Sequence, residues 1–335
     1  MENVFVGECT SHSLLASNKL APPLLARFNN GLMYRFTEGK VSSPEDLRRP
    51  EIYRGVARRL AEWHASLPVS AVTGSIGTSE HANGGMIKER KFSMEQSECF
   101  TPTKPTPNIW TVLAKWILVL PNSSDKEMNR KEQLRRELKW LYQELGDTKG
   151  IADNPLVFGH CDLLSGNVII QQSSCSSSPS SSASSPAPSS ISSEHPIAIV
   201  NFIDYEYATP TPAAFDIANH FAEWGGFDCD FSVLPTRAQR RDFLTNYLAS
   251  YNSFLDRSFQ ESEVEQLFKE VDLFRGMPGF YWGIWALVQA TISQIDFDYA
   301  NYAETRLGEY WAWKEVHTKK QNEKVSLRES RWATD

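Results

Sequence analysis

The chain has 335 residues, 41% of them hydrophobic and 22% charged, and its formal net charge at pH 7 is −7. This apolar content is sufficient to bury the core of one large domain or of two. The acidic balance and the lack of a basic stripe argue against a nucleic-acid partner.

The N-terminal elements are predicted to be a short helix and a hairpin. The helix is expected over Glu8 to Ser17. Two apolar runs, Leu24–Phe28 and Leu32–Phe36, then flank Asn29-Asn30-Gly31. Because Asn and Gly tolerate the positive φ of a tight turn, this pattern predicts a β-hairpin.

The middle of the chain alternates helices with segments of low complexity. Ser43 is predicted to cap the first long helix, whose apolar face recurs every three or four residues. Residues 68–106 lose this periodicity and are expected to form a surface excursion. Residues 173–193 are almost wholly Ser, Pro and Ala, which predicts a disordered loop. The remaining helices are expected at Ile109–Leu120, Asp125–Leu145 (with Met128 on its apolar side), Ala214–Trp224, Arg237–Leu255, Glu263–Arg275, Gly279–Ile295 and Asp298–Lys314, with Thr236 and Ser262 as caps.

The cysteines and the apolar segments indicate the compartment. Five cysteines without C-x-x-C spacing are typical of a reducing compartment. The N-terminus shows neither the positive nor the apolar region of a signal peptide. The apolar stretch Gly279 to Ile295 is short for a membrane span and carries polar residues, so it predicts a buried helix. We therefore expect a cytoplasmic protein without membrane insertion.

The stretch Val157 to Ile170, VFGHCDLLSGNVII, carries the pattern H-x-D-x-x-x-x-N between two predicted strands. A carboxylate and a carboxamide on one tight loop, Asp162 and Asn167, can both face a transferring phosphoryl group. The carboxylate would take the proton of the acceptor hydroxyl, and the carboxamide would bind Mg²⁺. On this stretch alone, a plain turn rich in Asp, Ser, Gly and Asn remains the alternative.

A second acidic segment strengthens the phosphotransfer interpretation. The apolar run Ile197 to Ile203 ends in Asp204, where a kinase-like fold places a second metal-binding carboxylate. Two metal-ligand types on successive strand ends, in this order, rarely arise by chance.

Four blocks of the chain resemble the choline and ethanolamine kinase family, in order: LAPPLLARFNNGLMYRF, GHCDLLSGN, FIDYEYATPTPAAFDIANHFAEWGG and PGFYWGIWALVQATISQIDFDYANYA. The loop motif alone is equally similar to aminoglycoside kinases, whereas FDIANHFAEW and WGIW are similar to the signature of this family. The resemblance implies an α+β, protein-kinase-like fold of the choline kinase and aminoglycoside phosphotransferase type, with a large, mainly helical C-lobe.

The resemblance also implies roles for matched residues. Asp162 is implied as the catalytic base, and His160 is expected to hold the same loop by hydrogen bonds. Asn167 and Asp204 are implied as Mg²⁺ ligands. The implied acceptor pocket comprises Glu206, Glu223, Trp282, Trp285, Tyr299 and Tyr302, and the implied nucleotide contacts are Glu8, Met33, Tyr34 and Phe36. A carboxylate and aromatic faces suit an alkylammonium group, although the spacing of the two tryptophans alone would favour core packing.

The start of the chain departs from the family pattern. A Gly-rich loop and a strand bearing a lysine normally precede the helix that contains Glu8, but here only Met1 to Gly7 precede it. We therefore expect residues 1–40 to be the remnant of a truncated N-lobe with its hinge, and residues 41–335 to form the C-lobe. Without that lysine and loop the ATP triphosphate would be poorly neutralised. The unpaired hairpin edge, Leu24 to Phe36, predicts self-association, including a homodimer.

The implied activity is ATP-dependent phosphorylation of ethanolamine to phosphoethanolamine, the first step of a route to phosphatidylethanolamine. The stretch GGFDCDF after Trp224 resembles the ethanolamine branch. A primary ammonium rewards carboxylates, whereas a quaternary one rewards aromatic enclosure. The alternatives are a choline kinase, or a truncated and catalytically weak module that binds ethanolamine or regulates a partner.

Overall fold

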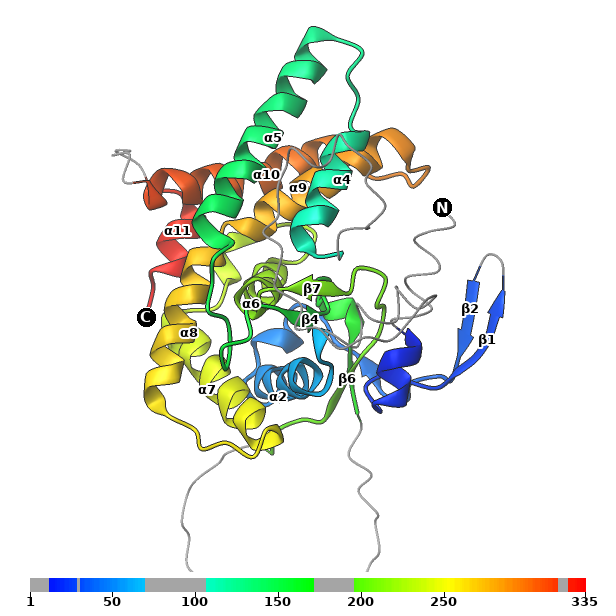
Figure 1. Ribbon diagram of the computed structural model, residues 1–335, viewed down its shortest axis with the longest axis vertical. Helices are drawn as coiled ribbons and strands as arrows, with labels where there is room; N and C mark the ends of the chain where they lie inside the picture. Colours follow the sequence, from blue (N-terminus) through cyan, green and yellow to red (C-terminus); the bar gives the residue numbers. More distant parts are fainter. Residues whose placement is uncertain (1–11, 29–30, 70–106, 172–195, 319–324) are drawn as a thin grey trace, which may run out of the picture.

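The computed structural model describes residues 12–28, 31–69, 107–171, 196–318 and 325–335 (Figure 1). The segments predicted as a surface excursion, 68–106, and as a disordered loop, 173–193, lie largely or wholly outside the described residues, as does Glu8.

A short helix and a hairpin form the first described part. Residues 12–17 are helical, with Leu15 buried and Leu14 partly buried. Strands β1 (Leu24–Phe28) and β2 (Gly31–Tyr34) pair antiparallel, as the sequence predicted. In Figure 1 this hairpin stands at the side of the molecule, away from the helices.

Two small antiparallel sheets lie at the centre. One has the order β3 (Lys40–Val41), β5 (Val168–Ile170), β6 (Val200–Phe202), and the other pairs β4 (Val157–Gly159) with β7 (Thr209–Thr211). Lys40 pairs with Ile170 of β5, so this residue belongs to the central sheet and not to the hairpin.

Helix α2 (Pro50–Ser66) packs on both sheets through its predicted apolar face. Trp63 is fully buried there, and its Nε1 donates a hydrogen bond of 2.7 Å to the carbonyl oxygen of Phe158 in β4. The predicted start of this helix was wrong, because α2 begins only at Pro50 and a separate short 3-10 helix, whose N-cap is Glu45, precedes it. The Ser43 hydroxyl accepts from the Asp46 amide at 3.2 Å in the turn before that 3-10 helix.

Helices make up most of the remaining chain (Figure 1). The α-helices are α4 (Ile109–Val119), α5 (Asp125–Leu145), α6 (Ala213–Ala222), α7 (Arg237–Phe254), α8 (Glu261–Phe274), α9 (Met277–Ile292), α10 (Tyr299–His317) and α11 (Leu327–Trp332). The 3-10 helices are η1 (Asp46–Arg48), η3 (Ser165–Asn167), η4 (Glu223–Gly225) and η5 (Phe231–Val233). Helices α9 and α10 form the most extensive helix pair.

The helix ends show where local signals sufficed. Thr236 caps α7, as predicted, by accepting from the Gln239 amide at 3.3 Å. Ser262 does not cap α8, because Gln260 occupies that position. Met128 was predicted on the apolar side of α5 but is exposed. In the described part of the chain no helix has both the length and the apolar character needed to cross a membrane.

Candidate active site

The loop between β4 and β5 brings the three motif residues together. Asp162 is 6% exposed, and its Oδ2 accepts from Nδ2 of Asn167 at 3.1 Å. The same Nδ2 also donates to the Asp162 carbonyl at 2.8 Å. Between His160 and Asp162, Cys161 has a left-handed backbone, with φ of 62°. Oδ1 of Asp162 is buried and has no hydrogen-bond partner among the described residues, so it is available to a ligand.

Both ring nitrogens of His160 contact backbone. Nε2 lies 3.1 Å from the Ile203 carbonyl oxygen, and the Asp162 amide donates to Nδ1 at 3.3 Å. Burial lowers the pKa of His160, which favours the neutral ring. These partners fix the tautomer with the proton on Nε2, so His160 ties the loop to the end of β6.

Side chains of helix α6 hold the backbone of the same loop by hydrogen bonds. This role of α6 was not predicted from the sequence. The carboxylate of Asp216 accepts from the amides of His160 at 2.9 Å and Cys161 at 2.7 Å. Asn219 Nδ2 donates to the Cys161 carbonyl at 2.9 Å, and His220 Nδ1 lies 2.9 Å from the Leu163 carbonyl. The available signal was three polar residues at i, i+3 and i+4 in an otherwise apolar helix, a spacing that places them on one face.

A second buried layer supports Asp216. Nε2 of His64 lies 2.9 Å from Oδ2 of Asp216, and its Nδ1 lies 2.7 Å from the Tyr247 hydroxyl. Burial opposes the ionisation of Asp216, but the hydrogen bond and charge of His64 and the amide of Cys161 together lower its pKa. Asp216 is therefore an ionised anchor for the loop.

The end of β6 places Asp204 beside Asn167. Val168 of β5 pairs with Phe202 of β6, and the Ile203 amide donates to the Asn167 carbonyl at 3.1 Å. Asp204 follows directly with φ of 66° and is exposed, so it is one residue from the backbone contact with Asn167.

This pair is the donor set that fits a magnesium ion. A carboxylate and a carboxamide oxygen are hard ligands, and Mg²⁺ bound to a nucleotide takes its other ligands from phosphates and water. Within the described ranges, no three His, Cys, Asp or Glu residues gather closely enough to hold a metal by themselves.

Four acids share one electrostatic environment. The pKa of Asp162 is raised well above its usual value, first by burial and then by the negative charges of Glu223, Asp204 and Glu206. Asp204 and Glu206 are exposed, whereas Glu223 is 4% exposed. Because the negative charges of the other three acids act on Asp162, a cation bound near Asp162 would be stabilised.

An aromatic wall extends from this cluster. The ring centroids of Trp282 and Trp285 are 5.5 Å apart at 87°, and Tyr299 lies 5.7 Å from Trp285. Nε1 of Trp282 donates to Oδ1 of Asn219 at 2.8 Å, which connects the wall to the residue that holds the loop. Tyr207, a residue not predicted, accepts from Nε1 of Trp285 at 2.8 Å.

The predicted nucleotide contacts lie on or near the hairpin. Tyr34 lies 4.9 Å from the ring of His12, which in turn lies 5.4 Å from Tyr205, so the hairpin and the segment after β6 meet through His12. Met33 is 50% exposed and Phe36 80% exposed.

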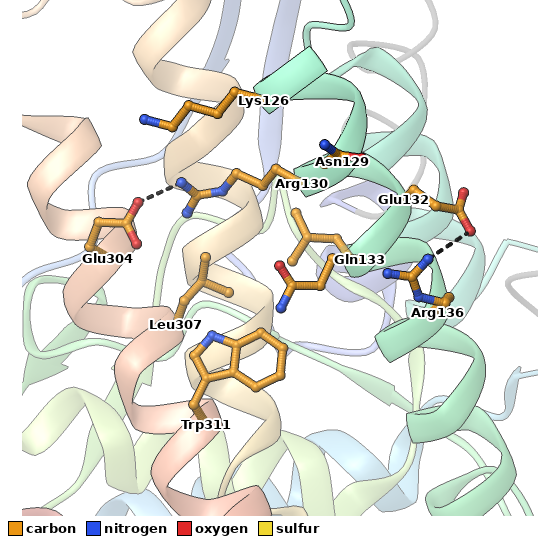
Figure 2. A pocket seen from close by; sticks show the side chains of 10 residues that line it. Lys126, Asn129, Arg130, Glu132, Gln133, Arg136, Glu304, Leu307 and Trp311 are labelled. Carbon is orange, nitrogen blue, oxygen red and sulfur yellow. Dashed lines mark hydrogen bonds and ion pairs between the residues drawn. The ribbon is translucent and has the colours of Figure 1, made fainter. Parts of the chain in front are cut away.

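A separate hollow of about 800 Å³ lies between α5 and α10 (Figure 2). Leu134, Leu307 and Trp311 are its apolar residues, and the ion pair of Arg130 with Glu304, 2.5 Å, crosses its rim. None of the predicted site residues lines it. The hollow is therefore distinct from the acidic and aromatic cluster.

Comparison with known proteins places this geometry in a family. The family model described as Choline/ethanolamine kinase matches residues 2–311. The chain belongs to the choline/ethanolamine kinase family. Curated relatives of this family include Ethanolamine kinase 1 of Mus musculus, 31% identical over 92% of this chain and 72% of its own length, and Ethanolamine kinase of Drosophila melanogaster, 36% identical over 92% and 50%. Ethanolamine kinase 1 of Homo sapiens is 30% identical over 92% of this chain and 58% of its own length. The chain thus spans between half and three quarters of the length of these relatives.

Solved structures confirm the predicted fold class. The Plasmodium vivax ethanolamine kinase superposes with a TM-score of 0.66 at 22% identity, covering 94% of this chain and 74% of its own. The choline kinase from Cryptosporidium parvum gives a TM-score of 0.60 at 19% identity, with 93% and 78% covered. The protein therefore has the protein-kinase-like choline kinase fold, α+β with a mainly helical C-terminal part.

Proposed function

We propose that this protein transfers the γ-phosphoryl group of ATP to the hydroxyl of ethanolamine, giving phosphoethanolamine. The observation that carries the proposal is the buried carboxylate of Asp162, with one oxygen unpartnered, beside three further acids and an aromatic wall. This combination suits an acceptor with a hydroxyl at one end and a cation at the other.

Asp162 is the proposed base. Its free Oδ1 would accept the hydrogen of the acceptor hydroxyl and orient the oxygen for in-line attack, while Asn167 holds Oδ2 at 3.1 Å. Burial and the neighbouring acids raise the pKa of Asp162, and a cation bound nearby would lower it by offsetting those acids.

Asn167 and Asp204 are the residues proposed to hold Mg²⁺. When bound, the ion neutralises charge on the ATP phosphates. The left-handed backbone at Asp204 and the amide of Ile203 bonded to Asn167 keep the two side chains at neighbouring strand ends. His160 and Asp216 are positioning residues, because each binds backbone of the loop and not the reacting atoms.

The ammonium end is proposed to lie between Glu223 and the aromatic wall of Trp282, Trp285 and Tyr299. Tyr302 continues this wall, because the ring of Phe297 lies 4.9 Å from Tyr299 and 5.6 Å from Tyr302. An ammonium against an aromatic face gains about 0.5–2 kcal/mol, depending on desolvation. Three N–H donors of ethanolamine can bind carboxylate oxygens, which a quaternary ammonium cannot. The names of the relatives, ethanolamine kinases at 30–36% identity, support this substrate.

Choline is the second candidate acceptor. The ring of Phe227 lies 6.2 Å from Tyr302 and 6.3 Å from Phe297, so an additional aromatic side chain joins the edge of the wall. Aromatic enclosure favours a quaternary ammonium.

The test is phosphoryl transfer from Mg·ATP by the purified chain to ethanolamine and to choline, measured as ADP release and as phosphorylated product. Asp162→Asn, which keeps the size of the side chain, is the control. We expect ethanolamine to be the better substrate and the variant to lose about 10²–10⁴-fold in kcat. If choline turnover equals or exceeds that of ethanolamine, choline replaces ethanolamine as the assigned acceptor. If a folded chain phosphorylates neither, the proposal is refuted.

A further inference from the structure

Glu223 is held by a buried arginine from another helix. Arg306 of α10 is 1% exposed, and its Nη2 donates to Oε1 of Glu223 at 3.2 Å. The same guanidinium lies 3.0 Å from Oε1 of Glu309 and 3.4 Å from the hydroxyl of Tyr302. One planar group therefore contacts two residues of the proposed acceptor pocket and a carboxylate behind them.

The ion pairs continue to the C-terminal helix. Oε2 of Glu309 accepts from Nε of Arg328 at 3.1 Å, Arg328 donates to Glu329 at 3.0 Å, and Glu329 pairs with Arg275 at 2.7 Å. Starting from Glu223 and Arg306, the charges alternate in sign and sum to zero. Helix α11, which supplies Arg328 and Glu329, lies beyond residue 311, where the family match ends.

Burial makes this arrangement costly unless every member is paired. A buried ion that loses its partner costs far more than an exposed one, so each charge depends on the next. The fork of an arginine fixes the orientation of the groups that it contacts, which a lysine cannot do to the same extent. Arg306 therefore determines both the direction of the Glu223 carboxylate and the position of the Tyr302 ring.

We propose that Arg306 is a positioning and specificity residue for the acceptor: by holding Glu223 and Tyr302 in place it makes the pocket select a cationic alcohol over a neutral one. Oε1 of Glu223 accepts the hydrogen bond from Arg306, and the second oxygen of a carboxylate such as Glu223 can accept from an ammonium. This inference rests on the proposed function, because it deepens the assignment of the acceptor pocket.

The two possible roles of Arg306, structural support and acceptor specificity, predict different results. Loss of structural support lowers turnover of every acceptor alike. Loss of the ammonium contact lowers turnover of the cationic acceptor alone, and it acts mainly on KM.

The test compares ethanolamine with ethylene glycol, its neutral counterpart of equal length. The main variant is Arg306→Met combined with Glu309→Gln, which removes one positive and one negative charge and keeps the network neutral. Arg306→Lys keeps the charge but not the fork. Arg240→Met is the matched control, because Arg240 is 2% exposed, pairs with Asp272 at 3.6 Å and donates to the carbonyls of Pro235 and Trp332 rather than to Glu223. Ethanolamine binding in the presence of Mg²⁺ and a non-hydrolysable ATP analogue is measured by calorimetry alongside the kinetics.

For the double variant we expect a rise of about 10–100-fold in KM and Kd for ethanolamine, because Glu223 loses the guanidinium that orients its carboxylate, with little change in kcat/KM for ethylene glycol. Arg306→Lys should fall between this variant and the wild type, and Arg240→Met should keep the wild-type ratio between acceptors. If the double variant does not fold, the ratio in Arg306→Lys decides. An unchanged ratio in folded Arg306 variants, or the same loss of ratio in Arg240→Met, overturns the inference. A wild-type chain that neither binds nor phosphorylates ethanolamine refutes the proposed function, and the inference falls with it.

Discussion

Replacing Asp216 by asparagine tests whether α6 positions the catalytic loop. The carboxylate accepts from the amides of His160 and Cys161 at 2.9 and 2.7 Å and from His64 at 2.9 Å, all in the buried interior. An asparagine has one acceptor oxygen, so its NH₂ group must face at least one of these donors.

The magnitude follows from these contacts. Hydrogen bonds to a charged group contribute about 1.5–3 kcal/mol each, so we expect Asp216→Asn to lower the free energy of unfolding by about 2–4 kcal/mol. A shift of the loop that moves Asp162 by about 1 Å would lower kcat by about 10²-fold. The KM for ATP should change little, because Asp216 contacts the loop and not the strand ends.

The assay is urea unfolding and steady-state kinetics of the same preparations. Asp256→Asn is the matched control, because Asp256 is exposed and has φ of 51°, a conformation that asparagine tolerates. Stability and kcat of Asp216→Asn that both equal those of the control would refute the reasoning.

The same anchor gives a pH dependence. The pKa of Asp216 is lowered in the folded chain, although burial alone would raise it. The stability that it contributes is therefore complete above the unfolded value of about 3.9 and is lost as the pH falls through the lower folded value. Unfolding curves of wild type and Asp216→Asn should accordingly converge below about pH 4.

Three further predictions concern the wall, a buried histidine and a glycine. Trp285→Ala should raise the KM for ethanolamine by about 2–30-fold through loss of a cation–π contact, whereas Trp311→Ala in the separate hollow should not; equal effects in kinetic assays would contradict the assignment. Burial lowers the pKa of His220 from 6.5 to about 4, so unfolding below pH 6.5 takes up a proton. Calorimetry should therefore show that the free energy of unfolding falls by about 3 kcal/mol between pH 6.5 and 4. The fall should be smaller in His220→Asn. A Cβ on Gly159 would lie 2.3 Å from a Thr211 methyl, so Gly159→Ala should lower the free energy of unfolding in urea by about 1–3 kcal/mol. Gly308 has open space around a Cβ, so Gly308→Ala should raise it by about 0.5–1 kcal/mol. Similar values for both variants would exclude the steric explanation.

Local signals in the sequence predicted the secondary structure best. Helix α5 begins at Asp125 and ends at Leu145, as predicted, because Ser124 and Glu127 form a capping box at its start. The prediction at Ser43 failed for a physical reason, since its hydroxyl accepts from an amide three residues on in a turn as readily as at the start of an α-helix. Met128 was predicted on the apolar side of α5 but is exposed, because periodicity gives the face of a helix but not where the neighbouring helices end.

The candidate site was only partly readable from the sequence. The spacing of Asp162 and Asn167 identified the loop, because both residues lie on one short segment. Asp216 and Arg306 were not assigned, because their contacts join segments 55 and 83 residues apart in the chain, which no local pattern encodes. The only local sign of Asp216 was a charged residue in an apolar helix.

Helix α6 also sets the distance between Asp216 and Glu223. It carries Asp216, which bonds the loop that contains Asp162, and leads directly into Glu223, which is proposed to bind the ammonium end of the acceptor, seven residues and about 10 Å farther along the axis. Single substitutions between them change chemistry but not this spacing. One inserted or deleted residue would shift the two ends by about 1.5 Å and turn one against the other by about 100°. In related chains the length of this stretch should therefore be kept.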